Sequence, residues 1–312
     1  MSTNKSIKNP KDLALGAVSQ RPSLKDQTTE QASSKPTLDP AEGARQLLRE
    51  LNVQDIPIQP RDIAEQLQII VWEREMESQY DGCLMRVGDT WGILLNNLIQ
   101  SESRKNFTIA HELGHYYLES GQTERQFSAT DEENKVAEFV PQHRCQRDDL
   151  HGFDSHRLEE QRANQFAVEL LMPSPIFRAD ATALPEIGLP AIDALADQYS
   201  TSLTSTAIRY TRLSPHVCAI VLSEQGQVKY FAYSDRFRQN SDCYLDTNKP
   251  LHSDSVAALF TKGESKEVKE RQREVPLSHW CSTQSDQPLI EQSRRLPRMN
   301  QVLSFLWLSD SP

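Results

Sequence analysis

The sequence predicts an α+β protein in three parts. These are a disordered tail (1–39), a mainly helical domain with a small antiparallel sheet (40–214) and a C-terminal α+β module rich in strands (215–312). Apolar residues recur at helical spacing in several segments of the second part. Between two groups of these segments, short β-branched runs alternate with turn dipeptides. From His216 onward the pattern changes to strand-like runs, which places the boundary near residue 214.

The tail differs from the rest of the chain in composition and charge. It is rich in Ser, Thr, Lys, Gln and Pro and has few large apolar residues, which is typical of disorder. The 312 residues carry a formal net charge of -10; the tail contributes +2, so the remainder carries -12. Such an acidic surface argues against direct binding to nucleic acid, which needs basic residues to neutralise phosphates. It would suit a basic partner protein instead.

The sequence also predicts where the protein resides. No apolar run approaches the roughly 20 residues of a membrane span, and the N-terminus lacks the apolar core of a secretory signal. We therefore expect a cytoplasmic protein without a membrane partner. Its five cysteines are scattered and form no CxxC pair, which predicts free thiols in a reducing compartment and no cysteine cluster at a metal. They are Cys83, Cys145, Cys218, Cys243 and Cys281.

The second part begins with two predicted helices and a small sheet. Apolar spacing predicts helices at 41–51 and 61–69, separated by prolines. The β-branched run at 69–74 then starts a predicted antiparallel sheet of about three strands, with turns at Asp81-Gly82 and Gly88-Asp89. This sheet comes directly before the most informative segment of the chain.

That segment is FTIAHELGHYYL, which contains His111, Glu112 and His115. Histidines four residues apart lie on one face of a helix, about 6 Å apart along its axis, so both can reach one metal ion. Glu112 lies too far around the helix to join them easily as a ligand, but it can accept a proton from water beside the metal. This pattern predicts a zinc-hydrolase site with two imidazole ligands and a carboxylate base.

The residues around the motif favour a helix. An apolar stripe runs through Phe107, Ala110, Gly114, Tyr117 and Leu118, with the two histidines along its edge. Gly114 is a poor helix former, so its position between the two histidines predicts that another element approaches closely there.

A catalytic zinc site commonly has a third protein ligand, and the sequence offers several. The candidates after the motif are Asp148, Asp149, His151, His156, Glu159, Glu160 and Glu169. A third helix is predicted around 157–175, ended by Pro173 and Pro175. Glu169 lies opposite the apolar stripe of this helix, so we expect it to be exposed to solvent. Glu159 and Glu160 lie at opposite edges of that stripe, and helical phase alone does not separate them.

A family resemblance does separate them. FTIAHELGHYYL followed by EQRANQFAVELLMP resembles the ImmA/IrrE family of zinc metallopeptidases, and the resemblance covers roughly residues 41–310. It implies a zincin-like metallopeptidase domain at 40–214. It also implies that Glu160 is the third ligand and that Asn164 occupies the motif's Asn position. Members of the family act on transcriptional repressors, often with a helix-turn-helix domain, so the resemblance implies a protein substrate in gene regulation.

Together these observations predict a zinc metallo-endopeptidase. Zn2+ would be bound by His111, His115 and Glu160, and Glu112 would act as the general base. Tyr116 or a residue of the 120–157 segment could stabilise the oxyanion.

The sequence departs from the family in one segment. The stretch between His115 and Glu160 is longer than usual and contains QHRCQRDDLHGFDSH. Its candidate ligands are His143, Cys145, His151 and His156. They could bind a second metal or cover the active site, or the segment could be a polar surface insertion. His156 could also replace Glu160 at the zinc.

Two other functions fit parts of the sequence. The chain could be a sensor that binds zinc without cleaving anything, although a purely structural site would not need Glu112. It could also be a DNA-binding regulator, because 190–213 has the length of a helix-turn-helix with Arg209 and Arg212 on its second helix. We interpret 190–213 as two helices, around Ser200–Thr201, that pack on the domain core.

The C-terminal module is predicted from its strand-like runs. VCAIVLS and VKYFAYS flank a turn at Gly226 and predict a β-hairpin. The last apolar run, 301–309, is either a strand or a closing helix. Such a module could sense a ligand or dock a substrate.

Overall fold

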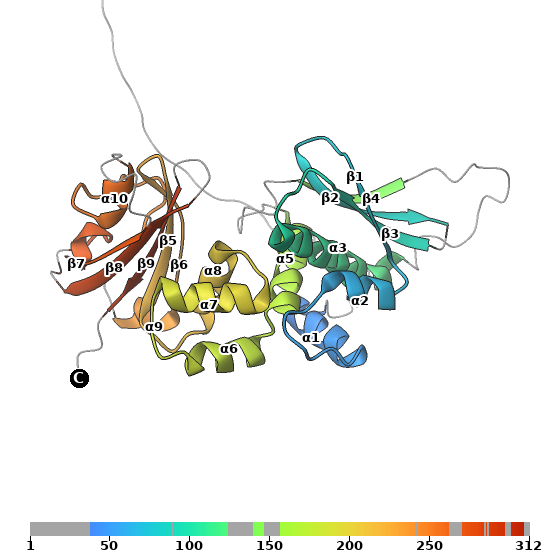
Figure 1. The fold of residues 1–312 in the computed structure, drawn as a ribbon, viewed down its shortest axis with the longest axis horizontal. Helices are drawn as coiled ribbons and strands as arrows, with labels where there is room; N and C mark the ends of the chain where they lie inside the picture. Colours follow the sequence, from blue (N-terminus) through green and yellow to red (C-terminus); the bar gives the residue numbers. More distant parts are fainter. Residues whose placement is uncertain are drawn as a thin grey trace, which may run out of the picture. The chain divides into compact units, whose positions relative to one another are not determined.

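A computed structural model describes the chain at 38–88, 90–123, 140–146, 157–240, 243–261, 270–283, 285, 287–296 and 301–308. The described residues form helices, one small sheet and a larger antiparallel sheet, so the predicted α+β class is confirmed (Figure 1). The tail predicted to be disordered lies outside the described residues, except for its last two.

The first two helices begin at prolines. These are α1 (Pro40–Glu50) and α2 (Pro60–Gln66). Proline is favoured in the first turn of a helix because its fixed φ suits the helix and its missing N–H would have no partner there. At α1 the side chain of Asp39 also accepts a hydrogen bond from the Glu42 amide at 2.9 Å. Both helices lie where the apolar spacing predicts them.

The first sheet has four strands in the order β1 (Ile70–Arg74), β3 (Thr90–Asn96), β2 (Tyr80–Val87) and β4 (Val140–Gln146). The prediction of a purely antiparallel sheet of about three strands needs correction, because β1 pairs parallel to β3 and a fourth strand joins from beyond the motif helix. The physical reason is the local hairpin of β2 and β3. This hairpin has two outer edges; β4 pairs with β2 at one of them, and β1 pairs with β3 at the other, where it runs in the same direction as β3.

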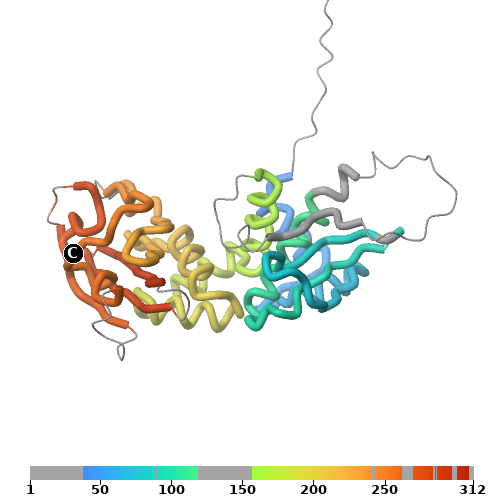
Figure 2. The backbone as a smooth tube through the Cα atoms, turned by 90° about the horizontal axis from the view of Figure 1, so that it is seen from above, coloured from blue at the N-terminus to red at the C-terminus, as the bar shows by residue number. Residues whose placement is uncertain are grey.

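The described residues between β3 and the second sheet form five helices. They are α3 (Glu102–Thr123), α5 (Leu158–Leu171), α6 (Ser174–Ala183), α7 (Leu189–Tyr199) and α8 (Leu203–Leu213). α3 packs against α5 and contacts β2, while α5 also packs against α1 (Figure 2). The sequence did not predict α6. Pro173 and Pro175 end one helix but also begin the next, as the N-cap and a first-turn residue of α6.

The C-terminal part contains a five-stranded antiparallel sheet in the order β6-β5-β9-β8-β7. In chain order, the elements of this C-terminal part are β5 (Cys218–Glu224), β6 (Gln227–Tyr233), α9 (Asp235–Asn240), α10 (Val256–Thr261), β7 (Glu270–Pro276), the 3-10 turn η1 (Leu277–His279), β8 (Pro288–Arg295) and β9 (Gln301–Trp307). The predicted hairpin is confirmed, with Gln225 and Gly226 at positive φ in its turn. The final apolar run is a strand, the central one of this sheet, and not a closing helix.

The central strands of the larger sheet, β5 and β9, are buried on both faces because their residues alternate between two hydrophobic clusters. Ile220 of β5 belongs to a first cluster, which also contains residues of α1, α3, α5, α7 and α8 and of the first sheet. Its neighbours Ala219 and Val221 belong to a second cluster around α10. The first cluster therefore continues across the predicted boundary near residue 214, and the division of the chain at that residue stays a prediction.

Two expectations about cysteine and membranes can be compared with the structure. Cys243 and Cys281 form a disulfide, so the expectation of free thiols throughout is wrong for this pair. The two lie 38 residues apart in sequence, and only folding brings their Cα atoms to 4.9 Å. Cys83 and Cys218 are buried thiols outside any disulfide, whereas the side chain of Cys145 is not described. No helix in the described ranges is long and apolar enough to cross a membrane.

Candidate metal centre

The HELGH motif forms part of α3, as its apolar spacing predicts. His111 and His115 lie one turn apart on the same face, and their side chains are 0% and 1% exposed. Their Nε2 atoms are 3.1 Å apart. Two buried imidazoles therefore present their nitrogen atoms to the same small volume.

Glu160 of α5 completes this group. Its Oε2 lies 3.1 Å from Nε2 of His111 and 3.5 Å from Nε2 of His115, and its side chain is 1% exposed. Ligands at the corners of a zinc tetrahedron with bonds of about 2.0–2.1 Å are separated by about 3.3–3.4 Å. The separations of the three donor atoms match this value. The two-imidazole, one-carboxylate set therefore fits a metal ion such as zinc.

The structure separates the two adjacent glutamates that helical phase left open. Glu159 points to solvent, with a side chain that is 62% exposed, whereas Glu160 is buried beside the histidines. One residue turns the side chain by about 100° around the helix axis. Only Glu160 of the pair is therefore part of the metal-ligand group.

Asn164 fixes the orientation of the first histidine. Its Oδ1 lies 2.9 Å from Nδ1 of His111. An amide oxygen can only accept a hydrogen bond, so Nδ1 donates and the proton is held on that nitrogen. The lone pair of Nε2 is then directed at the site, as a metal ligand requires. The sequence identified Asn164 only by its place in the family motif and did not predict this contact.

Burial and contacts set the protonation of the ligands. Burial lowers the pKa of His111, which favours the neutral imidazole, although the hydrogen bond with Glu160 opposes the shift. Burial by itself would raise the pKa of Glu160. The hydrogen bonds and charges of His111 and His115 outweigh that effect and hold the pKa of this carboxyl well below its usual range. A neutral imidazole and an ionised carboxylate are the forms that bind a metal.

Glu112 lies on α3 between the two histidines and faces β2. The residue is 0% exposed. Gly82 of β2 passes directly over it, because a Cβ added to Gly82 would lie 3.4 Å from Oε1 of Glu112 and 2.5 Å from Cγ2 of Thr108. The absence of a side chain at Gly82 therefore allows the strand to cross the helix at this point. The predicted turn at Asp81-Gly82 is wrong, because both residues lie within β2, and the sequence did not reveal this role of Gly82.

An ion pair helps to hold β2 in this position. Asp81 is 0% exposed and accepts a hydrogen bond from Nε of Arg104 at 2.6 Å. Arg104 lies in the first turns of α3, so the pair ties the start of the strand to the helix that contains Glu112. Buried carboxylates commonly require such a cationic partner.

The close approach predicted at Gly114 is confirmed. A Cβ at this position would lie 3.1 Å from both the Cα and the carbonyl oxygen of Ala163 and 3.2 Å from Cβ of Phe166. These residues belong to α5. Gly114 therefore lets the two helices approach closely enough for Glu160 to reach the histidines.

Tyr116, a suggested oxyanion donor, is partly buried. Its ring packs edge-on against Trp91 of β3, with ring centroids 5.4 Å apart. It follows His115 directly on α3 and, four residues after Glu112, lies on the same side of the helix as that carboxylate. Its role in the oxyanion site stays a prediction, as does that of the 120–157 segment.

Several other sequence-predicted ligands cannot be placed. Asp148, Asp149, His151 and His156 lie outside the described residues. His143 and Cys145 belong to β4, but their side chains are not described. A second metal in this segment therefore remains a hypothesis from the sequence, as does His156 as a replacement for Glu160.

Glu169 differs from its prediction. The sequence places it on the polar side of α5, but its side chain is only 3% exposed. It accepts hydrogen bonds from Arg45 of α1 at 2.9 Å, from Arg209 of α8 at 2.5 Å and from the amide and hydroxyl of Ser174 at the start of α6. The helices around α5 cover its polar side, which helical periodicity alone does not reveal. Glu169 therefore links four helices and is not a metal ligand.

The ion pair of Glu169 with Arg209 argues against the DNA-binding alternative. Helices α7 and α8 match the predicted helix pair, but the side chain of Arg209 is 11% exposed and donates to both Glu169 and the carbonyl of Met172. The inner face of α8 is buried in the first hydrophobic cluster, including Ala207, Ile208 and Tyr210. Arg209 is therefore not available to contact DNA from this position.

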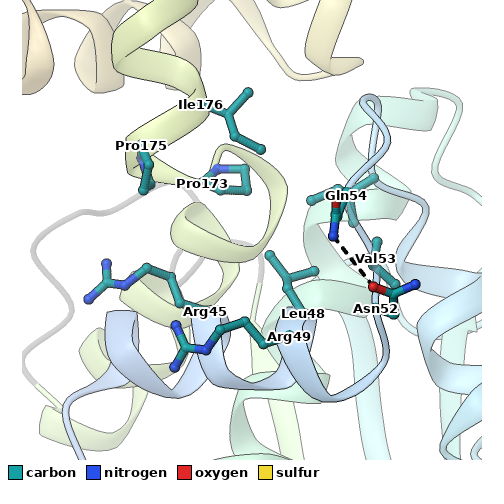
Figure 3. A pocket seen from close by; sticks show the side chains of 10 residues that line it. Arg45, Leu48, Arg49, Asn52, Val53, Gln54, Pro173, Pro175 and Ile176 are labelled. Carbon is teal, nitrogen blue, oxygen red and sulfur yellow. Dashed lines mark hydrogen bonds between the residues drawn. The ribbon is translucent and has the colours of Figure 1, made fainter.

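A separate groove of about 280 Å³ lies between α1, the loop after it and the α5–α6 junction (Figure 3). Arg45 and Arg49 border it, and none of the three candidate ligands lines it. Its remaining lining residues are Leu48, Asn52, Val53, Gln54, Ile58, Pro173, Pro175 and Ile176. The groove is thus distinct from the metal centre.

Comparison with known proteins agrees with this site. The model of the IrrE N-terminal-like domain, Peptidase_M78, matches residues 64–211, which include all three candidate ligands and Glu112. No curated protein sequence matches the chain. Among solved structures, a Mycobacterium tuberculosis transcriptional regulator is similar, with a TM-score of 0.52 and 12% sequence identity. The match covers 86% of this chain and 76% of that one, and at this identity it shows a similar fold.

Proposed function

The chain belongs to the ImmA/IrrE family through its IrrE N-terminal-like domain at residues 64–211, and from this we propose that it is a zinc-dependent metallo-endopeptidase. The proposed reaction is hydrolysis of a peptide bond in a specific partner protein. The observation that carries the proposal is the meeting of His111, His115 and Glu160 in a buried site, with the Glu112 carboxylate beside them on the same helix.

The proposed roles follow from position and chemistry. His111, His115 and Glu160 would bind the zinc ion, and Asn164 would hold His111 in the tautomer that presents Nε2. When bound, zinc supplies Lewis acidity, which lowers the pKa of water and polarises a carbonyl group. Glu112 would accept the proton of the attacking water and donate it to the leaving amine. Gly82 and the Asp81–Arg104 pair would keep β2 close to this carboxylate.

We propose a transcriptional repressor, with a helix-turn-helix domain, as the substrate. The support comes from the family resemblance, because its members act on such repressors. The charge of the chain agrees with a basic partner, since DNA-binding proteins have basic surfaces and this chain has a net charge of -10. We place the reaction in the cytoplasm, where such a repressor would be found.

The substitution Glu112→Gln tests the base. It removes the proton acceptor but keeps the size of the side chain, so zinc content should stay near that of the wild type while cleavage is abolished. The assay would use the purified chain and a helix-turn-helix repressor encoded beside it, with zinc measured by mass spectrometry. Glu159→Gln is the matched control, because this neighbour of Glu160 points to solvent, and it should leave zinc content and cleavage unchanged. Retained cleavage by Glu112→Gln would show that another group is the base. A zinc-loaded wild type that cleaves no repressor would support the alternative of a zinc-binding sensor.

A further inference from the structure

The C-terminal module contains a second group of metal-ligand side chains, His252, Asp254 and His279. Each offers one ligand atom, and these atoms all lie within 4.8 Å of one another. His252 and Asp254 come from the loop before α10, and His279 is the last residue of η1, so the group joins two segments that are 25 residues apart in sequence. The two imidazole rings lie face to face, with centroids 3.9 Å apart.

We propose that these three residues form a second transition-metal site, separate from the one on α3 and α5. Two imidazoles and one carboxylate are typical zinc ligands, whereas Ca2+ and Mg2+ prefer oxygen ligands alone. With three protein ligands, a tetrahedral ion has one position left for water or for a side chain of a partner.

The backbone on each side of the group is held in place. The carbonyl of His252 accepts hydrogen bonds from the amide of Ser255 at 3.0 Å and from its hydroxyl at 2.8 Å. On the other side, Trp280 and Cys281 are buried and both donate backbone hydrogen bonds to Leu277, while Cys281 is joined to Cys243 by the disulfide. A site between two fixed segments requires little ordering of the chain when an ion binds.

The side chains retain the freedom that binding requires. A zinc ion with bonds of about 2.0–2.1 Å brings its ligand atoms to about 3.3–3.4 Å, so separations of up to 4.8 Å must shorten by about 1.5 Å. His252 and Asp254 are exposed and can rotate to do so. The Nδ1 atom of His279 is buried and has no hydrogen-bond partner among the described residues. A buried polar atom usually has a partner, and a metal ion bound at this nitrogen would provide one.

Metal stoichiometry tests the proposal without any peptidase assay. The full-length chain, stripped of metal with a chelator and dialysed against Zn2+, should bind two equivalents. The double variant His252→Ala/His279→Ala should bind one, and so should His111→Ala/His115→Ala. Asp254→Asn keeps the size of the side chain and should weaken only the second site, by about tenfold or more. His216→Ala, a histidine of the same module outside the group, is the control and should bind two.

Two results would overturn the proposal. One is a wild-type chain that binds a single equivalent, which is lost in His111→Ala/His115→Ala. The other is a His252→Ala/His279→Ala variant that still binds two. Far-UV circular dichroism of each variant shows whether it is folded, and Asp254→Asn provides a milder change if the double variant does not fold. Because stoichiometry is counted site by site, failure of this proposal can be told apart from failure of the proposed peptidase.

Discussion

Glu160 and Glu169 are the same residue type on the same helix, and both are almost fully buried, yet their surroundings differ. Glu160 faces two imidazoles, and its nearest guanidinium group is that of the exposed Arg157, at 3.7 Å. Glu169 faces two closer guanidinium groups, those of Arg45 at 2.9 Å and Arg209 at 2.5 Å. Arginine is charged at every physiological pH, so the protein itself neutralises Glu169. Burial favours the neutral form of His111, and the charge of the exposed Arg157 is screened by solvent, so Glu160 is less completely neutralised than Glu169. An incompletely neutralised buried carboxylate is costly, so a cation bound beside Glu160 would be favourable.

The largest expected effect concerns the glutamate with arginine partners. Glu169→Ala leaves Arg209 buried without its carboxylate, which typically costs about 3–5 kcal/mol. We therefore expect urea denaturation to show a loss of this size in the free energy of unfolding. Glu159→Ala, at an exposed position of the same helix, is the control and should change it by about 0.5 kcal/mol or less. A loss below about 1 kcal/mol for Glu169→Ala would mean that Glu169 contributes no more to the free energy of unfolding than Glu160 does.

The second effect concerns the glutamate with histidine partners. Glu160→Gln should weaken zinc binding by more than about a hundredfold, because it removes a metal ligand and not only a residue that hydrogen-bonds to a ligand. The metal-free variant should be as stable as the metal-free wild type or more so, since the substitution removes a buried charge whose nearest cationic partner is the exposed Arg157. Zinc competition titration and thermal melting in chelator measure the two quantities. A lower melting temperature without metal would contradict the comparison.

The third effect is that of Asn164, which contacts a proposed ligand and not the metal. Asn164→Ala should lower zinc affinity by about 10- to 100-fold, because His111 loses the partner that holds its tautomer. Asn164→Asp restores an acceptor and should recover most of the affinity. If both variants bind zinc like the wild type, the hydrogen bond does not position the histidine.

The smallest effect is the contribution of Glu169 to the pH dependence of stability. Burial by itself would raise the pKa of Glu169, but the charge of Arg209 and the hydrogen bonds of Ser174 lower it below its ordinary value. A lowered folded-state pKa adds stability above the unfolded pKa of about 4.3, and this stability is lost as the pH falls through the folded value. From about pH 5 downward, the wild type should therefore lose stability more steeply than Glu169→Gln. Parallel curves of unfolding free energy against pH for the two proteins would refute this assignment.

The metal helix and its partner helix could be predicted because they depend on local spacing. Histidines four residues apart share a helix face in any context, and the apolar stripes of α3 and α5 follow from periodicity alone. Gly114 predicted the close approach of another element, and that element is α5. Periodicity left Glu159 and Glu160 equivalent, and only the family motif chose between them, in agreement with the burial of Glu160.

Other features could not be predicted because they depend on what surrounds an element. The polar side of α5 is covered by α1, α6 and α8, so Glu169 is buried although its helical phase indicated solvent. The parallel pairing of β1 follows from which edge of β3 is open. The disulfide of Cys243 with Cys281, and the meeting of His252 with His279, require two distant segments to fold onto one module.

By itself, the sequence determined the α+β class, the metal motif, the proposed base Glu112 and most helices and strands, because each depends on residues within a few turns of one another. The tertiary structure alone decided which carboxylate is enclosed by two arginines and which lies against the two histidines, and how closely β2 passes over Glu112. Those outcomes depend on packing between segments far apart in the chain. Hydrophobic patterns show which faces are buried, but they do not specify the partner of each buried charge.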